Sequence, residues 1–411
     1  MPSAALFESK IRCVDPNRVN ALRVWMVVIT LLTVNPAAAG TITFIITELP
    51  GDTPADATLT LGANLGGWDP GNPDYAFTRD DEGRYTLTLV IEDGTTIEYK
   101  VTQGSWQTVE RSADGGDIEN KTLEVDGDAI VELTVASWSA VDSPPRPSTV
   151  SGRVEVIEEV QSPQLGNSRD LLVYLPPDYA ESDARYPVLY MHDGQNLFDD
   201  ATSFSGEWGA DEAAEQLAQR GAGVIIVGIP NNADRISEYG PFPDEKYNAT
   251  GRGAEYAAFV VETIKPLIDQ RYRTLPGRTH TGIAGSSMGG LISLYTALVY
   301  PDTFGFAGVF SPALFVGDAK IFEWVEAHPN PDVRIYIDMG TREGMASAMD
   351  PDAQSARVNE TMRMAAMLVG QGNDVKLHIV RGAGHNEGAW RKRFPAVLGW
   401  FLETPAADAE P

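Results

Sequence analysis

The chain has 411 residues, of which 43% are apolar and 22% charged, so it is long enough for two domains or for one large domain with an extension. Its formal net charge of −27 argues against nucleic acid and anionic membranes as partners. Potential metal ligands are too dispersed in the sequence to specify a metal site, so neither a metal nor another cofactor is predicted.

Residues 1–39 have the pattern of a signal peptide. Basic residues precede an apolar run of 11 residues, Val24–Val34. An Ala-x-Ala cleavage pattern follows the run at residues 37–39. The run is too short to span a bilayer, which takes about 20 residues. We therefore expect cleavage before Gly40, a secreted or periplasmic protein, and no membrane span in the remaining chain; an uncleaved anchor is the alternative. The single cysteine, Cys13, lies in this segment.

Residues 40–140 are predicted to form a small all-β sandwich. Five segments alternate apolar and polar residues as half-buried strands do, and Gly, Asp and Pro punctuate them. These segments are Thr41–Ile46, Thr58–Leu61, Tyr85–Val90, Thr96–Val101 and Ala129–Val135.

Two tryptophans of this region lie in stretches that suggest sugar binding. Trp68 lies in Leu-Gly-Gly-Trp-Asp-Pro at 65–70, and Trp106 lies in Lys-Val-Thr-Gln-Gly-Ser-Trp-Gln-Thr at 100–108. Both stretches resemble starch-binding-type carbohydrate modules, and the resemblance implies exposed Trp rings that act as platforms for sugar faces. A large rigid ring offers contact area at little cost in conformational entropy. The alternative is that both rings fill the core of the sandwich.

The remaining chain is predicted to be a Pro-rich linker at 141–150, an α/β domain at 151–404 and an acidic tail at 405–411. In the α/β domain short apolar runs alternate with helical periodicity, which favours a mostly parallel sheet flanked by helices. The runs expected as strands are Leu171–Leu175, Val188–Met191, Val224–Ile229, Thr281–Gly285, Phe306–Phe310, Val333–Met339 and Val375–Val380. The segments expected as helices are Ala210–Arg220, Ala254–Asp269, Leu291–Tyr300, Ala319–Ala327, Ser355–Gly370 and Trp390–Leu402.

The segment Gly-Ser-Ser-Met-Gly-Gly at 285–290 joins a predicted strand to a predicted helix. Its Gly-x-Ser-x-Gly pattern fits the nucleophile elbow of α/β-hydrolases, in which a tight turn exposes the serine at the end of the sheet. Glycines at 285 and 289 remove side chains that would collide with the neighbouring strand and helix. Ser287 is therefore the predicted nucleophile; the alternative is a turn of small residues that only ends a strand.

A serine nucleophile needs a general base, and the base needs an acid that orients it. In this fold they follow the serine in the order acid, then histidine, on loops after strands. His385 lies in a glycine-rich loop between the last predicted strand and the last predicted helix, where the base belongs. Glu343, in the loop after Val333–Met339, is the first candidate for the acid, and Asp338 in that strand is its rival.

The oxyanion hole needs two N–H groups directed at the developing alkoxide. Met288, the residue after the nucleophile, is expected to supply one of them. The loop His-Asp-Gly-Gln-Asn at 192–196, which follows the strand Val188–Met191, is expected to supply the other.

Three motifs together resemble the esterase D / enterochelin esterase-like superfamily of α/β-hydrolases. They are Tyr-Met-His-Asp-Gly-Gln-Asn-Leu-Phe at 190–198, the elbow at 285–290, and Gly-His-Asn-Glu-Gly-Ala-Trp at 384–390. The resemblance covers about residues 155–403 and implies esterase activity, Glu343 as the acid and Gln195 as the second oxyanion residue. It does not identify a substrate, because the superfamily includes feruloyl, acetylxylan and siderophore esterases, S-formylglutathione hydrolases and mycolyltransferases.

Trp208 and Arg235 are further candidates for substrate contact, because they follow predicted strands on the catalytic side. Trp208 would pack against an acyl group or a sugar. Arg235 would bind an anionic group; a salt bridge between Arg235 and Glu238 is the alternative.

The sequence thus predicts an exported serine esterase that acts through an acyl-enzyme on acyl or feruloyl esters of carbohydrates. The β-sandwich would bring it to a polysaccharide and raise the local substrate concentration. Three alternatives stay open: cleavage of siderophore lactones, acyl transfer, and a non-catalytic carbohydrate-binding protein on a hydrolase scaffold.

Overall fold

The computed structural model describes residues 39–403, with gaps at 64, 66–69, 81, 114, 117, 119, 139–146, 204–205, 246, 248, 331 and 344–350. Nearly all of the predicted signal peptide, most of the linker, the acidic tail and Trp68 lie outside the described residues. Within the described ranges, no helix has both the length and the apolar character needed to cross a membrane.

Among the described residues of 39–138, the regular elements are β-strands and short 3-10 turns, and a strand overlaps each of the five predicted ones. A four-stranded sheet in the order β3-β4-β1-β8 and a three-stranded sheet in the order β2-β5-β7 contribute to one apolar cluster, in which Ile42 and Phe44 of β1 lie with Tyr99 and Val101 of β5. The strands are β1 (Ala39–Glu48), β2 (Thr60–Ala63), β3 (Thr78–Arg79), β4 (Tyr85–Glu92), β5 (Thr96–Thr102), β6 (Glu110–Arg111), β7 (Lys121–Glu124), β8 (Ala129–Thr134) and β9 (Ser137–Trp138).

The ring of Trp106 is partly buried against the backbone of β2. A Cβ atom at Gly62 would lie 2.7 Å from the ring, so the absence of a side chain at Gly62 allows this contact. Trp106 therefore neither fills the centre of the apolar cluster nor stands fully exposed.

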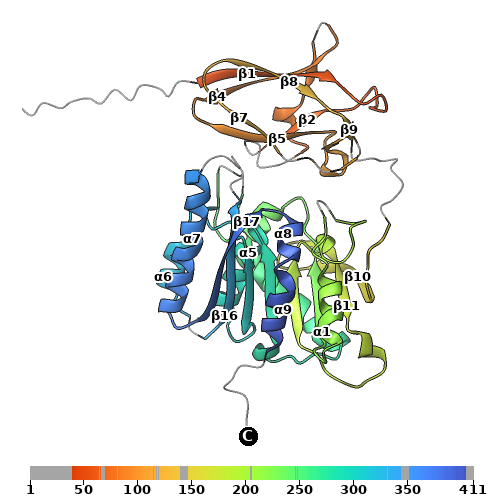
Figure 1. Cartoon of the computed structure of the whole chain (residues 1–411), viewed down its shortest axis with the longest axis vertical. Coiled ribbons are helices and arrows are strands. Elements are labelled where there is room, and N and C mark those ends of the chain that lie inside the picture. Colours follow the sequence, from red (N-terminus) through yellow and green to blue (C-terminus); the bar gives the residue numbers. More distant parts are fainter. Residues whose placement is uncertain are drawn as a thin grey trace, which may run out of the picture. The chain divides into compact units, whose positions relative to one another are not determined.

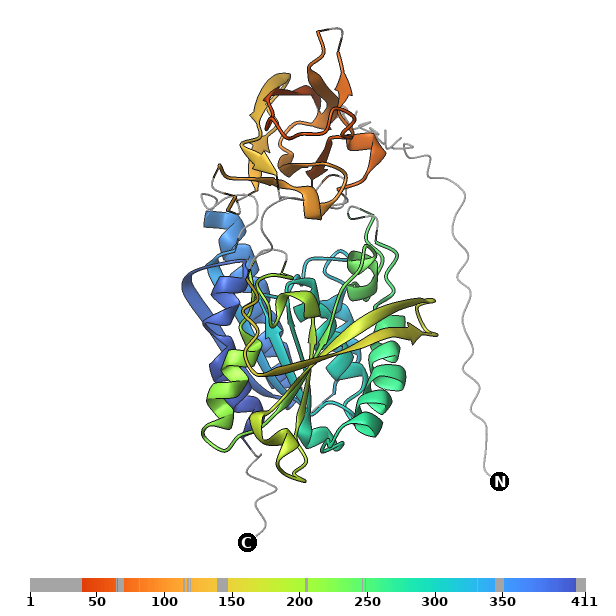
Figure 2. The same ribbon diagram turned by 90° about the vertical axis from the view of Figure 1, so that its right-hand side faces the viewer.

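Residues 153–403 contain an eight-stranded sheet, whose strands lie in the order β10-β11-β13-β12-β14-β15-β16-β17. The six strands from β13 to β17 in this order are parallel, and β10 and β11 form an antiparallel hairpin at one edge, yellow in Figure 2. The fold is therefore α/β with a mostly parallel sheet, as predicted. The strands are β10 (Arg153–Ser162), β11 (Asn167–Leu175), β12 (Val188–His192), β13 (Ile225–Ile229), β14 (Thr281–Ser286), β15 (Phe306–Phe310), β16 (Arg334–Arg342) and β17 (Asp374–Gly384).

Successive side chains of a strand point to opposite faces of the sheet, and here both faces are apolar. Helices therefore cover both faces. In β12, Val188 and Tyr190 belong to one apolar cluster, whereas Leu189 and Met191 belong to the other. The first cluster includes residues of α3 to α7, and the second includes residues of α1 and α9. Of these helices, Figure 1 labels α5, α6 and α7 from the first group and α1 and α9 from the second. The helices are α1 (Ala210–Ala218), α2 (Arg235–Tyr239), α3 (Gly253–Ala258), α4 (Lys265–Arg271), α5 (Met288–Val299), α6 (Ile321–Ala327), α7 (Pro351–Gly370), α8 (Glu387–Arg391) and α9 (Phe394–Leu402); a π-helical turn, Phe259–Ile264, joins α3 to α4.

The carboxyl ends of the parallel strands meet at one edge of the sheet, where open α/β folds bind their ligands. Each predicted catalytic side chain directly follows one of these strands. Ser287 follows β14, Glu343 follows β16 and His385 follows β17, while β12 runs into the predicted oxyanion loop.

Candidate active site

Ser287 occupies a strained turn between β14 and α5. Its φ of 57° and ψ of −122° lie outside the regions that residues with side chains normally adopt, at a cost of about 1–3 kcal/mol. The turn is tight because a Cβ atom at Gly285 would lie 2.9 Å from the backbone of Gly289. The Ser287 N–H donates to the carbonyl of Phe310 over 3.0 Å, and its own carbonyl accepts from Ala313 N over 3.0 Å. The neighbouring strand β15 and its following loop thus hold the elbow in this conformation.

The structure brings His385 and Glu343 together. The imidazole Nδ1 lies 3.2 Å from Glu343 Oε2, in a hydrogen bond in which the ring N–H donates. The Glu343 side chain is 1% exposed, whereas the His385 side chain is 21% exposed. The carboxylate is therefore enclosed, while part of the imidazole is accessible at the surface.

Asp338, the rival acid, is buried in strand β16 and has other partners. Its carboxylate accepts from Ser311 N over 2.9 Å and from the Tyr336 hydroxyl over 2.7 Å. Arg393 Nε lies 3.1 Å from it. Burial raises the pKa of Asp338 to about 6, and the Arg393 guanidinium opposes that shift. Among the described residues, Glu343 and not Asp338 forms a hydrogen bond with His385.

The predicted oxyanion loop is held against the end of β13. Gly194 begins a 3-10 turn, Gly194–Asn196, and a Cβ atom at this position would lie 2.6 Å from the carbonyl carbon of Gly228. Asp193, with a φ of 56°, binds Arg235 through contacts of 2.7 and 2.8 Å. The backbone N–H of Asn231 donates to the side-chain oxygen of Gln195 over 3.2 Å. This loop therefore carries Gln195 on a well-supported turn.

Two predicted substrate contacts need correction. Trp208 is only 3% exposed and packs its ring against Phe310, Trp390 and Phe394, with ring centroids 5.0 to 5.7 Å apart, so it belongs to the core. Arg235 does form an internal salt bridge, but with Asp193.

The partner proposed for Arg235 was also wrong. Glu238 is fully buried and pairs with Arg169, whose guanidinium lies 2.8 Å from its carboxylate. Arg235 therefore contacts the predicted oxyanion loop through Asp193.

His192 is buried against the turn that carries Ser287. Its Nδ1 hydrogen-bonds with the Tyr256 hydroxyl over 2.9 Å. Burial lowers the pKa of His192 to about 3, so the ring carries no charge near neutral pH. A Cβ atom at Gly289 would lie 3.2 Å from the Cβ of His192, which places the side chain directly against the elbow.

Polar contacts also connect the loop of the predicted base to the rest of the domain. Glu387, at the start of α8, accepts a hydrogen bond from Asn196 Nδ2 over 3.2 Å. At the end of α8, Arg391 forms an ion pair of 2.7 Å with Glu207. The position of His385, two residues before α8, therefore depends on side chains that follow β12.

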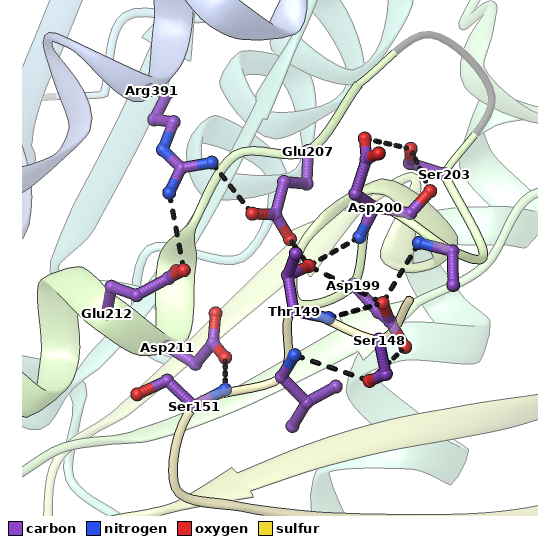
Figure 3. A network of polar contacts seen from close by, with 12 residues as sticks. Ser148, Thr149, Ser151, Asp199, Asp200, Ser203, Glu207, Asp211, Glu212 and Arg391 are labelled. Atoms are coloured by element: carbon purple, nitrogen blue, oxygen red, sulfur yellow. Dashed lines mark hydrogen bonds and ion pairs between the residues drawn. The ribbon is translucent and has the colours of Figure 1, made fainter. Parts of the chain in front are cut away.

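Residues 148–151, at the end of the predicted linker, join the same network (Figure 3). The Thr149 hydroxyl donates to Glu207 Oε2 over 2.8 Å and accepts from Asp200 N over 2.8 Å. The Ser151 N–H donates to Asp211 of α1. These residues are thus anchored to the hydrolase fold rather than free of it.

Sequence reasoning missed Ser311 and Arg393 because neither lies in a recognisable motif, and it gave Glu387 no role although Glu387 lies in the motif at 384–390. One signal was available for Ser311, since it directly follows a predicted strand, Phe306–Phe310, at the catalytic edge. Among the described residues, no group of three or more His, Cys, Asp or Glu side chains is arranged to hold a metal ion.

Comparison with known proteins identifies the family of this chain. Residues 162–401 match the model of the Esterase family, described as "Putative esterase". The uncharacterized protein YbbA of Bacillus subtilis (strain 168) is 28% identical over 245 residues, which are 57% of this chain and 93% of YbbA. The iron(III) salmochelin esterase of Escherichia coli O6:H1 is 26% identical over 330 residues, which are 75% of this chain and 72% of that protein.

Two further similarities are more limited. The alpha-amylase of Niallia circulans is 41% identical over 109 residues, which are 26% of this chain and only 8% of the amylase. Among solved structures, an IroE-like serine hydrolase from Shewanella oneidensis has a TM-score of 0.51 and 18% identity, and the match covers 61% of this chain and 80% of that one. At this identity the structural match supports the fold alone.

Proposed function

Because this chain belongs to the Esterase family and is a carboxylic ester hydrolase, we propose that Ser287, His385 and Glu343 form its catalytic triad and that it acts through an acyl-enzyme. The observation that carries the proposal is the 3.2 Å hydrogen bond between His385 and Glu343, at the same edge of the sheet as the strained Ser287. A nucleophile, a base and an acid that orients the base are the three roles such a reaction needs.

In the proposed reaction, Ser287 Oγ attacks the ester carbonyl carbon while His385 Nε2 takes its proton. The N–H groups of Met288 and Gln195 stabilise the resulting oxyanion. His385 then gives the proton to the leaving alcohol oxygen, and the bond from that oxygen to the carbonyl carbon breaks. Water then attacks the carbonyl carbon of the acyl-enzyme while His385 takes its proton. His385 returns the proton to Ser287 Oγ as the bond from Oγ to the carbonyl carbon breaks, and the carboxylic acid product is released. Glu343 holds the imidazole tautomer and stabilises the imidazolium that forms in each step.

Turnover of p-nitrophenyl acetate by the full chain tests the triad. We expect Ser287→Ala to lower kcat by about 10³-fold or more, because the nucleophile is lost while binding remains. Ser293→Ala is a matched control, since Ser293 is a buried serine on the same helix whose hydroxyl donates to Gly289 O over 2.7 Å. Equal rates for the parent and Ser287→Ala would remove Ser287 as the nucleophile.

We propose acyl or feruloyl esters of carbohydrates as the substrate class. The 109-residue similarity to an alpha-amylase and the resemblance of two stretches of 39–138 to starch-binding-type modules support this. The net charge of −27 also makes a neutral glycan ester a more favourable partner than a polyanion. Retention on insoluble starch or xylan, and its loss in Trp106→Ala, would support a carbohydrate-binding role of this segment; no retention of the parent would end it.

A siderophore lactone is the second candidate, favoured by the similarity to the salmochelin esterase over 75% of this chain. The net charge of −27 opposes it, and Arg235, the predicted contact for an anionic group, is paired with Asp193. Values of kcat/KM measured on feruloyl and acetyl esters of xylan oligosaccharides and on a tricatechol trilactone separate the two. A higher value on the trilactone would replace the carbohydrate proposal.

We also propose export with removal of residues 1–39. N-terminal sequencing of the protein recovered from the periplasm or medium of an expressing bacterium is expected to begin at Gly40. Recovery only from the membrane fraction with an intact N-terminus would favour the uncleaved anchor.

A further inference from the structure

Ser311 occupies an unusual position directly after strand β15. It is 1% exposed, and its φ of 43° lies in the left-handed region that favours glycine. A buried residue other than glycine in this conformation persists only where its surroundings determine it. The contacts of its hydroxyl show what those surroundings are.

The hydroxyl of Ser311 is fully used in hydrogen bonds. It donates to Glu343 Oε1 over 2.7 Å. It is also within hydrogen-bonding distance of two donors, Trp390 Nε1 at 2.9 Å and Arg393 Nη2 at 3.2 Å. A longer contact of 3.5 Å joins it to Asp338 Oδ1. A hydroxyl has one donor and two acceptor sites, so the short bond to Glu343 and the two bonds from Trp390 and Arg393 satisfy it.

These contacts determine how the carboxylate of Glu343 is presented. Its Oε1 accepts from Ser311 and also from the N–H of Gly340 over 2.5 Å. Its Oε2 is the oxygen that faces His385 Nδ1. Rotating the carboxylate would break both bonds to Oε1, so Ser311 and Gly340 together keep Oε2 toward the imidazole.

The same residue bears on the other two members of the site. Trp390, which donates to the Ser311 hydroxyl, packs edge-on against the His385 ring with centroids 5.0 Å apart. On the backbone, Phe310 O and Ala313 N, which flank Ser311 in sequence, bind the N–H and carbonyl of Ser287. One turn therefore contacts the acid, supports the base and brackets the nucleophile.

We infer that Ser311 is a positioning residue that sets the Glu343 carboxylate for hydrogen bonding to His385. The inference rests on the proposed triad, since Ser311 acts through Glu343 and not on the substrate. It predicts a loss of turnover with little change in KM, because no contact to substrate is removed.

Two variants in the full chain separate the hydroxyl from the backbone. Ser311→Ala removes the hydroxyl and keeps the strained φ, whereas Ser311→Gly removes the hydroxyl and relieves the strain. We expect both to lower kcat on p-nitrophenyl acetate by about 10- to 100-fold with KM within about twofold, since a small misplacement of catalytic groups has effects of this size. Ser162→Ala is the control, because Ser162 is a buried serine whose hydroxyl accepts from Leu165 N over 3.1 Å in the β10–β11 turn; it should keep the parent kcat.

A double-mutant cycle with Glu343→Ala gives the decisive readout. If Ser311 acts through Glu343, Ser311→Ala should have no further effect on kcat once the carboxylate is absent. The same fold-decrease in both backgrounds, or parent kcat in Ser311→Gly, would overturn the inference. If Ser311→Ala does not fold, the unstrained Ser311→Gly replaces it in the cycle.

The cycle also distinguishes failure of this inference from failure of the triad. Parent rates in Ser287→Ala or Glu343→Ala would remove the triad itself. Large losses in both, with an additive cycle, would remove only the positioning role of Ser311.

Discussion

Asn196 and Glu387 are hydrogen-bonded over 3.2 Å although 191 residues separate them in the chain. Both side chains are buried, and they join the turn that carries Gln195 to the helix that begins two residues after His385. The loop proposed to stabilise the oxyanion and the loop of the proposed base are therefore connected directly.

Breaking this connection should slow the reaction. We expect Glu387→Ala to lower kcat by about tenfold, because the base loop loses a buried contact and small displacements of catalytic groups are costly. Glu387→Gln should retain most of the activity, since its amide oxygen can still accept from Asn196. Kinetics on p-nitrophenyl acetate check both variants, and equal losses in the two would contradict a role for this hydrogen bond.

The two carboxylates near the site should respond differently to neutralisation. Glu343→Gln is expected to lower kcat by about 10²- to 10⁴-fold, because the imidazolium loses its anionic partner. Asp338→Asn should lower kcat far less but lower the free energy of unfolding by about 3 kcal/mol, because it leaves Arg393 buried without a full counter-charge. Steady-state kinetics and urea unfolding measure the two effects, and the reverse ranking of kcat would make Asp338 the acid.

His192 should make the protein less stable in acid. Its pKa is lowered to about 3 by burial, against about 6.5 in an unfolded chain. Between these values the unfolded state binds a proton that the folded state does not, so stability is complete above pH 6.5 and falls as the pH decreases toward 3. The expected loss from this group is about 2 kcal/mol at pH 5.

Urea unfolding at pH 7.5 and pH 5 tests this assignment. In His192→Asn, which does not titrate, the difference between the two pH values should be smaller by about 2 kcal/mol than in the parent. An identical difference in the two proteins would show that another group accounts for the acid sensitivity.

The anchor at Thr149 should contribute to the stability of the hydrolase. Thr149→Val removes a hydroxyl that bonds both Glu207 and Asp200 N, and it should cost about 1 kcal/mol. The midpoint of esterase inactivation in urea reports on this part of the chain. Thr263→Val is a comparable change, since that hydroxyl donates to Gln164 over 3.1 Å, and it should have a smaller effect. An unchanged midpoint in Thr149→Val would mean that the Thr149 hydroxyl contributes nothing to the stability of the hydrolase.

Most strands of the sheet could be predicted because they are short, continuous apolar runs buried on both faces. The exception is β10, Arg153–Ser162, whose pattern Arg-Val-Glu-Val-Ile-Glu-Glu-Val-Gln-Ser is largely polar because it lies at an exposed edge. The elbow could be predicted because its tight turn requires glycine at two positions, and that spacing is visible in the sequence.

Contacts between loops could not be predicted in the same way. A salt bridge between Arg235 and Glu238 was the alternative considered from the sequence. Instead, Arg235 pairs with Asp193, which is distant in sequence, and Glu238 pairs with Arg169. The choice between Glu343 and Asp338 depends on contacts with residues that are distant in sequence, because Glu343 faces His385 whereas Asp338 accepts from Ser311 N.

The position of His192 against the elbow also has an evolutionary consequence. A methyl group at Gly289 would meet the Cβ of His192 at 3.2 Å and the carboxylate of Asp193 at 3.4 Å. Every residue except glycine keeps a Cβ atom, so relatives that carry alanine or serine at position 289 should carry glycine at the histidine position, and the two sites should covary.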